Sequence, residues 1–138
     1  YALEGFWECA LIFNDETLLQ RVETALKRMS DSYKKHGKMA GRYTQDWQGD
    51  FSFACPIGQV QLSALLQRMG EPWQDFGLQL LSDTLPHQNR GNNKNTHGAL
   101  PGSVPIWGPY MRFRYPNWGV KFLLDALSGY TANSFSII

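Results

Sequence analysis

Two segments of the sequence repeat one pattern of aromatic residues and proline. Residues 47–56 read WQGDFSFACP and residues 107–116 read WGPYMRFRYP. Each begins with tryptophan, carries aromatic residues in between and ends in a proline at the same spacing. An apolar pattern of helical period follows each segment directly. A unit that recurs in this way is typical of helical-repeat proteins.

The repeated unit extends upstream of these segments. Residues 15–18 align with residues 70–73 after a small slip, and each stretch opens a second helix behind an apolar first one. The predicted unit is therefore helix, tight turn, helix and long aromatic loop, recurring roughly every 55 to 60 residues. Such units bury their apolar faces by stacking or by closing into a ring. The chain holds about two and a half of them.

Apolar residues at helical spacing predict five helices. The first covers about residues 2–13, and the second runs from a cap at Asn14 or Asp15 to Gly37. The third covers residues 57–69. The fourth runs from Pro72, in its first turn, to Leu85, and the fifth follows a cap at Asn117. We expect the first, third and fifth to be inner helices with neighbours on every side, and the second and fourth to face solvent. Two long loops are predicted. One covers residues 38–56 and contains a short extended piece at 51–53, and the other covers some thirty residues after Pro86. Both loops should gather at one end, around the mouth of a cleft, with Trp47 and Trp107 in equivalent places.

Three strings carry a family resemblance: DWQGD (46–50), ACPIGQVQLSALLQRMGEPW (54–73) and GALPGSVPIWGPYMRFRYPNWGVKFLLDAL (98–127). They resemble the C-terminal part of bacterial α/α-toroid proteins, grouped with six-hairpin glycosidase-like and prenyltransferase/squalene-oxidase-type repeats, that accompany exopolysaccharide genes. The resemblance implies an all-α fold of helical hairpins, part of an α/α toroid, that works on carbohydrate. It supplies no catalytic set, and GQVQ (58–61) stands where the family usually has Gly-Asn-Ala-Gln.

A complete toroid needs more hairpins than this chain holds. We therefore expect residues 1–138 to form a single toroid-like domain that is a fragment or truncated form, or that associates with further copies. One flank of the first helix and one of the last would be exposed, and Phe6, Trp7, Phe122 and Leu123 are the residues expected there. The expected partner of those flanks is a second copy or the remainder of a longer chain.

Sugar recognition needs flat aromatic rings and hydrogen-bonding side chains in one place. The aromatic candidates are Trp47, Trp107, Tyr110, Tyr115 and Trp118, and the polar ones are Gln59, Arg112, Arg114 and Asn117. Arg112 and Arg114 alternate with apolar residues, which predicts that they project from one side of an extended segment. The alternative is that the loop aromatics only cover the ends of helices. The expected partner is an oligosaccharide or polysaccharide.

Glycoside hydrolysis would require two carboxyl groups, about 5 Å apart for retention or about 6.5 to 9.5 Å apart for inversion. The catalytic candidates are Glu8, Asp46 and Asp50. Glu8 lies one helical turn after Glu4 on a largely apolar helix, where desolvation would favour a general acid. The alternative is that both glutamates pair with a basic residue of a neighbouring hairpin. The chain is accordingly expected to be glycosidase-like or lyase-like if catalytic, and otherwise a non-catalytic glycan-binding or helical-repeat protein-interaction domain.

Composition narrows the remaining functions. Thirteen Lys and Arg against twelve Asp and Glu give a formal charge of +1, so no overall electrostatic field favours binding of nucleic acid. The basic stretch 27–42 is interpreted as a solvated helix end. No metal or cofactor is expected, because the three histidines occupy loops at no ligand spacing and the two cysteines are predicted to be buried thiols. No apolar run approaches the roughly 20 residues of a membrane span. The lack of a signal peptide slightly favours the cytoplasm.

Overall fold

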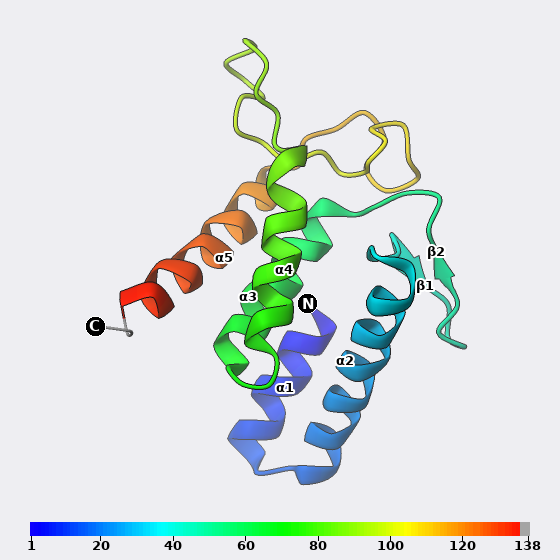
Figure 1. Cartoon of the computed structure of the whole chain (residues 1–138), viewed down its shortest axis with the longest axis vertical. Helices are drawn as coiled ribbons and strands as arrows, with labels where there is room; N and C mark the ends of the chain where they lie inside the picture. The colour runs from blue at the N-terminus through cyan, green and yellow to red at the C-terminus, as the bar shows by residue number, and fades with distance from the viewer. Residues whose placement is uncertain (136–138) are drawn as a thin grey trace.

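The computed structural model describes residues 1–135, with side chains as far as Tyr130, and within that range the chain is mostly helical (Figure 1). This confirms the expected all-α class; the exception is a two-stranded sheet. The elements are α1 (Ala2–Phe13), α2 (Glu16–His36), β1 (Arg42–Tyr43), β2 (Gly49–Asp50), α3 (Pro56–Met69), α4 (Gln74–Thr84), a short 3-10 helix η1 (Leu85–His87) and α5 (Asn117–Phe135).

Helices α1 and α2 form an antiparallel pair, whose ends are set by local sequence (Figure 1). Asn14 ends α1 in the left-handed conformation, with φ 52°. Asp15 then caps α2, because its side chain accepts a hydrogen bond from the backbone N–H of Leu18 at 2.9 Å. Gly37, with φ 67°, ends α2 in the same left-handed way. These boundaries agree with the helices predicted from periodicity.

Helices α3 and α4 form a second antiparallel pair, packed closely at Gly77. The Ser63 hydroxyl donates to the Gly77 carbonyl at 2.6 Å. A Cβ added at Gly77 would lie 3.0 Å from Leu66 Cβ and 3.0 Å from the Ser63 carbonyl oxygen. Pro72 lies in the turn before α4, rather than in the first turn of the helix as expected.

A pair of glycine substitutions tests this close approach. We expect Gly77→Ala to lower the free energy of unfolding by about 1 to 3 kcal/mol, because the added methyl group meets backbone and a core leucine. Gly5→Ala is the matched control: nothing lies within 4 Å of its added Cβ, and alanine in a helix gains about 0.5 to 1 kcal/mol. Urea unfolding measures both changes. If Gly77→Ala proved as stable as Gly5→Ala, the packing of α3 on α4 described here would be wrong.

Helix α3 is the centre of the fold, since it contributes to both apolar clusters. One cluster joins α2, α3 and α4: Val22, Leu26, Met39, Leu62, Leu65, Leu66 and Leu80. The other joins α3, α4 and α5 with the loop after η1: Ile57, Val60, Leu81, Leu100, Phe122, Leu123 and Ala126. Helix α4 therefore feeds both clusters through Leu80 and Leu81. Its other face carries the exposed residues Asp75, Gln79 and Ser82, as expected of a helix with one solvent-facing side.

Helix α1 is less buried than expected of an inner helix, but the exposure expected on one flank is confirmed at Phe6. Ala10 is its only buried residue. The exposed large apolar residues of α1 are Phe6, Leu11, Ile12 and Phe13, and Trp7 is partly buried. Helix α5 exposes Trp118, Val120, Leu124 and Tyr130, but it buries Phe122 and Leu123. The expected exposure of Phe122 and Leu123 is therefore wrong, because these two side chains pack on α3.

A hydrogen bond joins α2 to the end of α4. The Tyr33 hydroxyl donates to Asp83 Oδ2 at 2.6 Å, and Gln79 Nε2 donates to the other oxygen of Asp83 at 2.8 Å. Burial and the hydrogen bond to Asp83 raise the pKa of Tyr33 to about 12. A pKa raised on folding means that the stability linked to this group is present below the ordinary value of 10.0 and is lost as the pH rises through about 12.

The protein should therefore lose stability between pH 10 and 12, in part through Tyr33. We expect Tyr33→Phe to be less stable at neutral pH but to lose less free energy of unfolding over that range. Ultraviolet titration of the phenolates should also lack the last-ionising tyrosine in this variant. If the tyrosine lost in the variant were one that ionises near the ordinary value of 10.0, the raised pKa of Tyr33 and its contact with Asp83 would be wrong.

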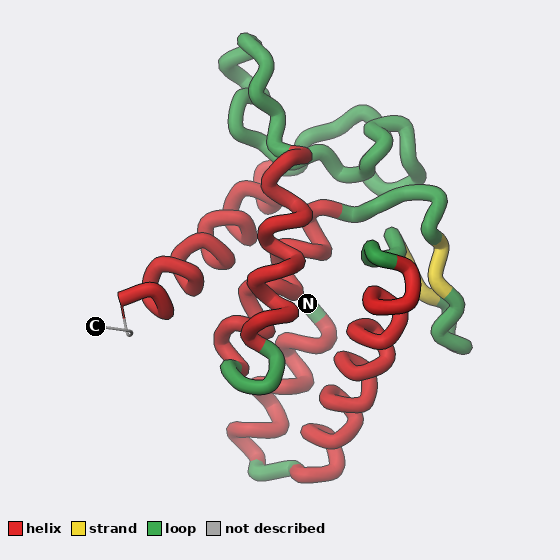
Figure 2. Tube along the Cα trace, viewed as in Figure 1, coloured by secondary structure: helices red, strands yellow, loops and turns green. Residues whose placement is uncertain are grey.

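The two long loops meet beside the helices. In the first, β1 and β2 pair antiparallel, with Arg42 opposite Asp50, so the extended piece lies on either side of the turn rather than at 51–53 as expected (Figure 2). Ala54 bridges to Val104 of the second loop through backbone hydrogen bonds of 2.7 and 3.0 Å. Within the described part of the chain, no helix combines the length and the apolar character needed to span a membrane.

Candidate functional site

The loop from Leu100 to Pro116 has a buried base that fixes its shape. Leu100, Pro101, Gly102 and Ser103 are all buried. The Ser103 hydroxyl donates to the Tyr110 carbonyl at 2.6 Å and accepts from the Tyr110 N–H at 3.0 Å. Further along, the Phe113 N–H donates to the Ile106 carbonyl at 2.8 Å and closes the 106–113 segment. Backbone bonds, rather than burial of its aromatic rings, therefore hold this segment.

Four aromatic rings of the segment and of the first turn of α5 face solvent. Trp107 is 62% exposed and Phe113 is 65% exposed, whereas Tyr110 and Trp118 are each 39% exposed. Leaving such rings in water forgoes about 1.5 to 3 kcal/mol each. Tyr115 is half-buried, and the polar candidates of this region, Arg112, Arg114 and Asn117, are exposed. We call the four exposed rings, Trp107, Tyr110, Phe113 and Trp118, the aromatic platform.

Backbone conformation places the arginines differently from the sequence prediction. Met111 and Phe113 have positive φ values of 47° and 57°. A segment with two left-handed residues is not extended, so Arg112 and Arg114 do not alternate along a strand. Positive φ is uncommon for a bulky residue such as phenylalanine and concentrates at functional sites. Phe113 is therefore an additional candidate for ligand binding. The sequence prediction used it only as the apolar residue between the two arginines. Its position among Trp107, Tyr110 and Tyr115 was the feature of the sequence that could have identified it.

Trp47 does not occupy a place equivalent to that of Trp107. It lies in the β1–β2 turn with φ 62° and is half-buried. The Arg28 guanidinium lies 5.5 Å from the centre of its ring, and the Tyr43 ring lies 6.0 Å away. These contacts attach the hairpin to α2. The repeated tryptophans of the sequence thus have different surroundings, and Trp47 is an anchor of the fold.

The favoured catalytic acid, Glu8, forms an ion pair. Arg68 of α3 donates to Glu4 at 2.9 Å and to Glu8 at 2.7 Å, and it lies 5.3 Å from the centre of the Trp7 ring. The hydrogen bond to Glu8 is the main cause that raises the pKa of Arg68. Pairing with an arginine of the neighbouring hairpin was the alternative weighed for both glutamates, and the structure has that arrangement. Arg68 therefore holds both carboxylates in ion pairs that join α1 to α3.

The two aspartates of the first loop also lack the environment of a catalytic pair. Asp50 accepts hydrogen bonds from the Ser52 hydroxyl at 2.5 Å and the Ser52 N–H at 3.0 Å, and it pairs with Arg42 at 3.1 Å. The Ser52 hydroxyl, foremost among these contacts, lowers the pKa of Asp50. Asp46 is an exposed residue of the β1–β2 turn. A carboxylate with a lowered pKa fits a structural contact better than proton transfer at neutral pH.

Gln59 belongs to the helical core and not to the aromatic platform. It is 8% exposed, and its amide oxygen accepts a hydrogen bond from the Thr84 hydroxyl at 3.0 Å. Thr84 ends α4, so the bond ties α3 to α4. The structure thus separates two of the predicted sugar-binding residues, the hairpin anchor Trp47 and the core residue Gln59, from those of segment 107–118.

The two cysteines lie in different environments. Cys9 is exposed, which corrects the expectation of a buried thiol, whereas burial raises the pKa of the Cys55 thiol. Among the residues whose side chains are described, no three His, Cys, Asp or Glu gather in a way that could hold a metal ion.

No protein-family model, curated protein or solved structure matches the chain. What the site can do therefore follows from its own geometry and chemistry.

Proposed function

We propose that this chain is a non-catalytic, toroid-like helical domain that binds an oligosaccharide or polysaccharide on the aromatic platform. The observation that carries the proposal is the exposure of Trp107 and Phe113, at 62% and 65%, on a segment closed by backbone hydrogen bonds. A pyranose ring presents one face of C–H groups, which stacks on such rings, and hydroxyl groups at its edge. The exposed side chains of Arg112, Arg114 and Asn117 supply donors for those hydroxyls.

The binding function is favoured over a glycosidase or lyase because two of the three candidate acids, Glu8 and Asp50, are already engaged. Glu8 is held by Arg68, and Asp50 is held by Ser52 and Arg42. The two antiparallel helix pairs, each followed by a long loop, support the toroid-like architecture and the interpretation of residues 1–138 as one domain. Stacking rings next to arginines would also suit single-stranded nucleic acid, so the experiment must separate the two ligands.

An array of bacterial polysaccharide fragments, with single-stranded oligonucleotides printed beside them, tests the proposal. We expect saturable binding to one group of glycans and no retention on the oligonucleotides. A reducing-end assay on each bound glycan should detect no new chain ends. Release of sugar would favour the catalytic alternative, and binding only to oligonucleotides would contradict a glycan function.

A second proposal concerns self-association through α1. The end of this helix leaves Ile12 71% exposed and Phe13 76% exposed, next to Leu11 at 51%. Apolar side chains gathered in this way on a protein surface mark an interface. We infer that a second copy of the chain covers them.

Sedimentation equilibrium at micromolar concentration should therefore show a dimer or larger species. We expect Ile12→Asp to shift the protein to monomer, since a charge in an apolar interface must be desolvated. Glu16→Gln, an exposed change just beyond the turn, is the control and should leave the equilibrium unchanged. A wild-type protein that sediments as a monomer would rule out this second proposal without affecting the first.

A further inference from the structure

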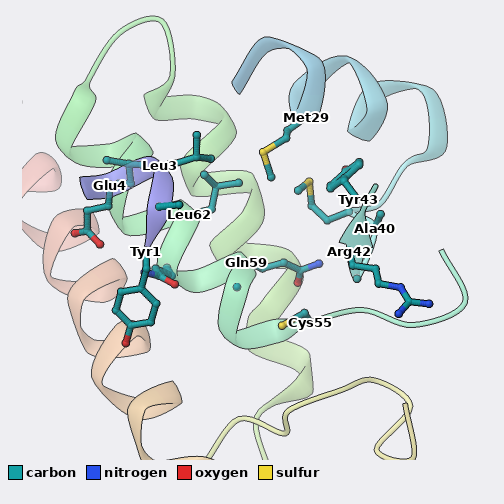
Figure 3. Close-up of a pocket in the computed structure, with 16 residues that line it drawn as sticks. Tyr1, Leu3, Glu4, Met29, Ala40, Arg42, Tyr43, Cys55, Gln59 and Leu62 are labelled. Carbon is teal, nitrogen blue, oxygen red and sulfur yellow. The ribbon is translucent and has the colours of Figure 1, made fainter. Parts of the chain in front are cut away.

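A cavity of about 310 Å³ lies between α1, α2, β1 and α3, apart from the aromatic platform (Figure 3). Its walls are mainly apolar: Leu3 from α1, Met29 from α2, Met39 from the segment after α2, and Leu62 and Leu65 from α3. An engineered apolar cavity of about 150 Å³ is large enough to bind benzene. The space here is therefore sufficient for a molecule of about two fused rings. Methionine side chains adapt their shape to such a guest.

Two polar atoms in the walls have no partner. The Tyr43 hydroxyl and the Gln61 amide nitrogen are buried and form no hydrogen bond with a described residue, and both side chains line the cavity. A buried donor left unsatisfied costs about 1 to 3 kcal/mol. Both groups can donate a hydrogen bond. A guest with an oxygen acceptor would satisfy them.

The charged side chains that line the cavity are already paired. Glu4 binds Arg68 at 2.9 Å, and Arg42 binds Asp50 at 3.1 Å. Cys55 also lines the cavity, and burial raises the pKa of its thiol, which disfavours the nucleophilic thiolate. Because the charged side chains in the walls are paired, a neutral guest held without a covalent bond suits the space best.

We propose that this cavity binds a neutral, mostly apolar small molecule that carries a carbonyl or hydroxyl oxygen. Gln61 and Tyr43 donate hydrogen bonds to that oxygen, and the leucines and methionines surround the apolar body. The site is separate from the platform, so it does not depend on glycan binding.

The experiment uses three matched probes with the full chain. They are 2-acetylnaphthalene, its oxygen-free counterpart 2-ethylnaphthalene and the anionic 2-naphthoate. We expect the ketone to bind saturably, at least about tenfold more tightly than either other probe, because only the ketone is both neutral and an acceptor. Amide spectra should place its largest shifts at Tyr43 and Gln61, including the Gln61 side-chain N–H signals. No saturable binding, equal affinity for the three probes, or shifts confined to the platform would overturn the proposal.

Two side-chain variants separate a ligand contact from a structural role. Tyr43→Phe and Gln61→Met should each weaken the ketone about three- to tenfold, while the free protein keeps or gains thermal stability because an unsatisfied group is removed. Tyr33→Phe, which removes a hydroxyl outside the cavity, should leave the affinity unchanged. Met29→Trp should abolish binding by filling the space, with folding checked by circular dichroism. Unchanged affinity in both Tyr43→Phe and Gln61→Met would refute the assigned contacts, as would a lower thermal stability of both variants.

Discussion

Replacing Phe122 with alanine should lower the free energy of unfolding by about 3 to 5 kcal/mol, the largest effect expected of any single change considered for this chain. Phe122 is 3% exposed and belongs to the cluster shared by α3 and α5. Its ring also packs edge-on against Tyr1, with centroids 5.2 Å apart. Truncation removes this apolar area and leaves a cavity, because the surrounding helices relax only in part. Urea unfolding, followed by circular dichroism, measures the loss.

Phe113→Ala is the matched control. The two residues share a side chain, but Phe113 is 65% exposed on the 106–113 segment. Its truncation should change the free energy of unfolding by no more than about 0.5 kcal/mol, the usual range for an exposed position. Equal losses in the two variants would mean that α5 does not pack on α3 as described.

Replacing Trp107 with alanine should weaken glycan binding by about one to two powers of ten. Aromatic anchors of binding sites contribute on the order of 1 to 3 kcal/mol, and each 1.4 kcal/mol is about tenfold in affinity. Thermal stability should not change, because the ring is 62% exposed. Calorimetric titration with a glycan selected on the array gives the affinity, and a thermal melt of the same sample gives the stability.

Trp47→Ala provides the opposite pattern. Trp47 packs on Arg28 and Tyr43, so its truncation should reduce thermal stability and leave glycan affinity unaltered. Together the two variants test whether the repeated tryptophans have separate roles. If Trp47→Ala lost affinity and Trp107→Ala lost stability, the assignment of platform and anchor would be reversed.

The helices could be predicted from the sequence because their signals are local. Apolar spacing, the cap at Asp15 and the glycine at position 37 fix α2 without reference to other parts of the chain. Which face of each helix is buried depends on neighbours that the pattern does not identify. For that reason the burial of Phe122 and Leu123 against α3 was not predicted, although an exposed flank on α1 was.

The candidate site was predictable in residue type but not in geometry. An aromatic loop rich in arginine was evident, yet no sequence pattern predicts the left-handed backbone at Met111 and Phe113 or the bonds that Ser103 makes to Tyr110. The partner of Glu8 could be named only as a basic residue of a neighbouring hairpin. Arg68 takes that place because α3 packs near α1 in space, across a separation of 60 residues. Likewise, no sequence pattern places Tyr43 and Gln61 at one cavity.

The indole N–H signals of the five tryptophans offer the most direct test of the central claim, because each reports on a different part of the molecule. In an NMR titration with the selected oligosaccharide, the signals of Trp107 and Trp118 should shift and saturate together. Those of Trp7, Trp47 and Trp73 should stay in place, since these rings lie against the helices. A shift of Trp7, beside Glu4, Glu8 and Arg68, with none at Trp107, would contradict the claim that the aromatic platform binds the glycan.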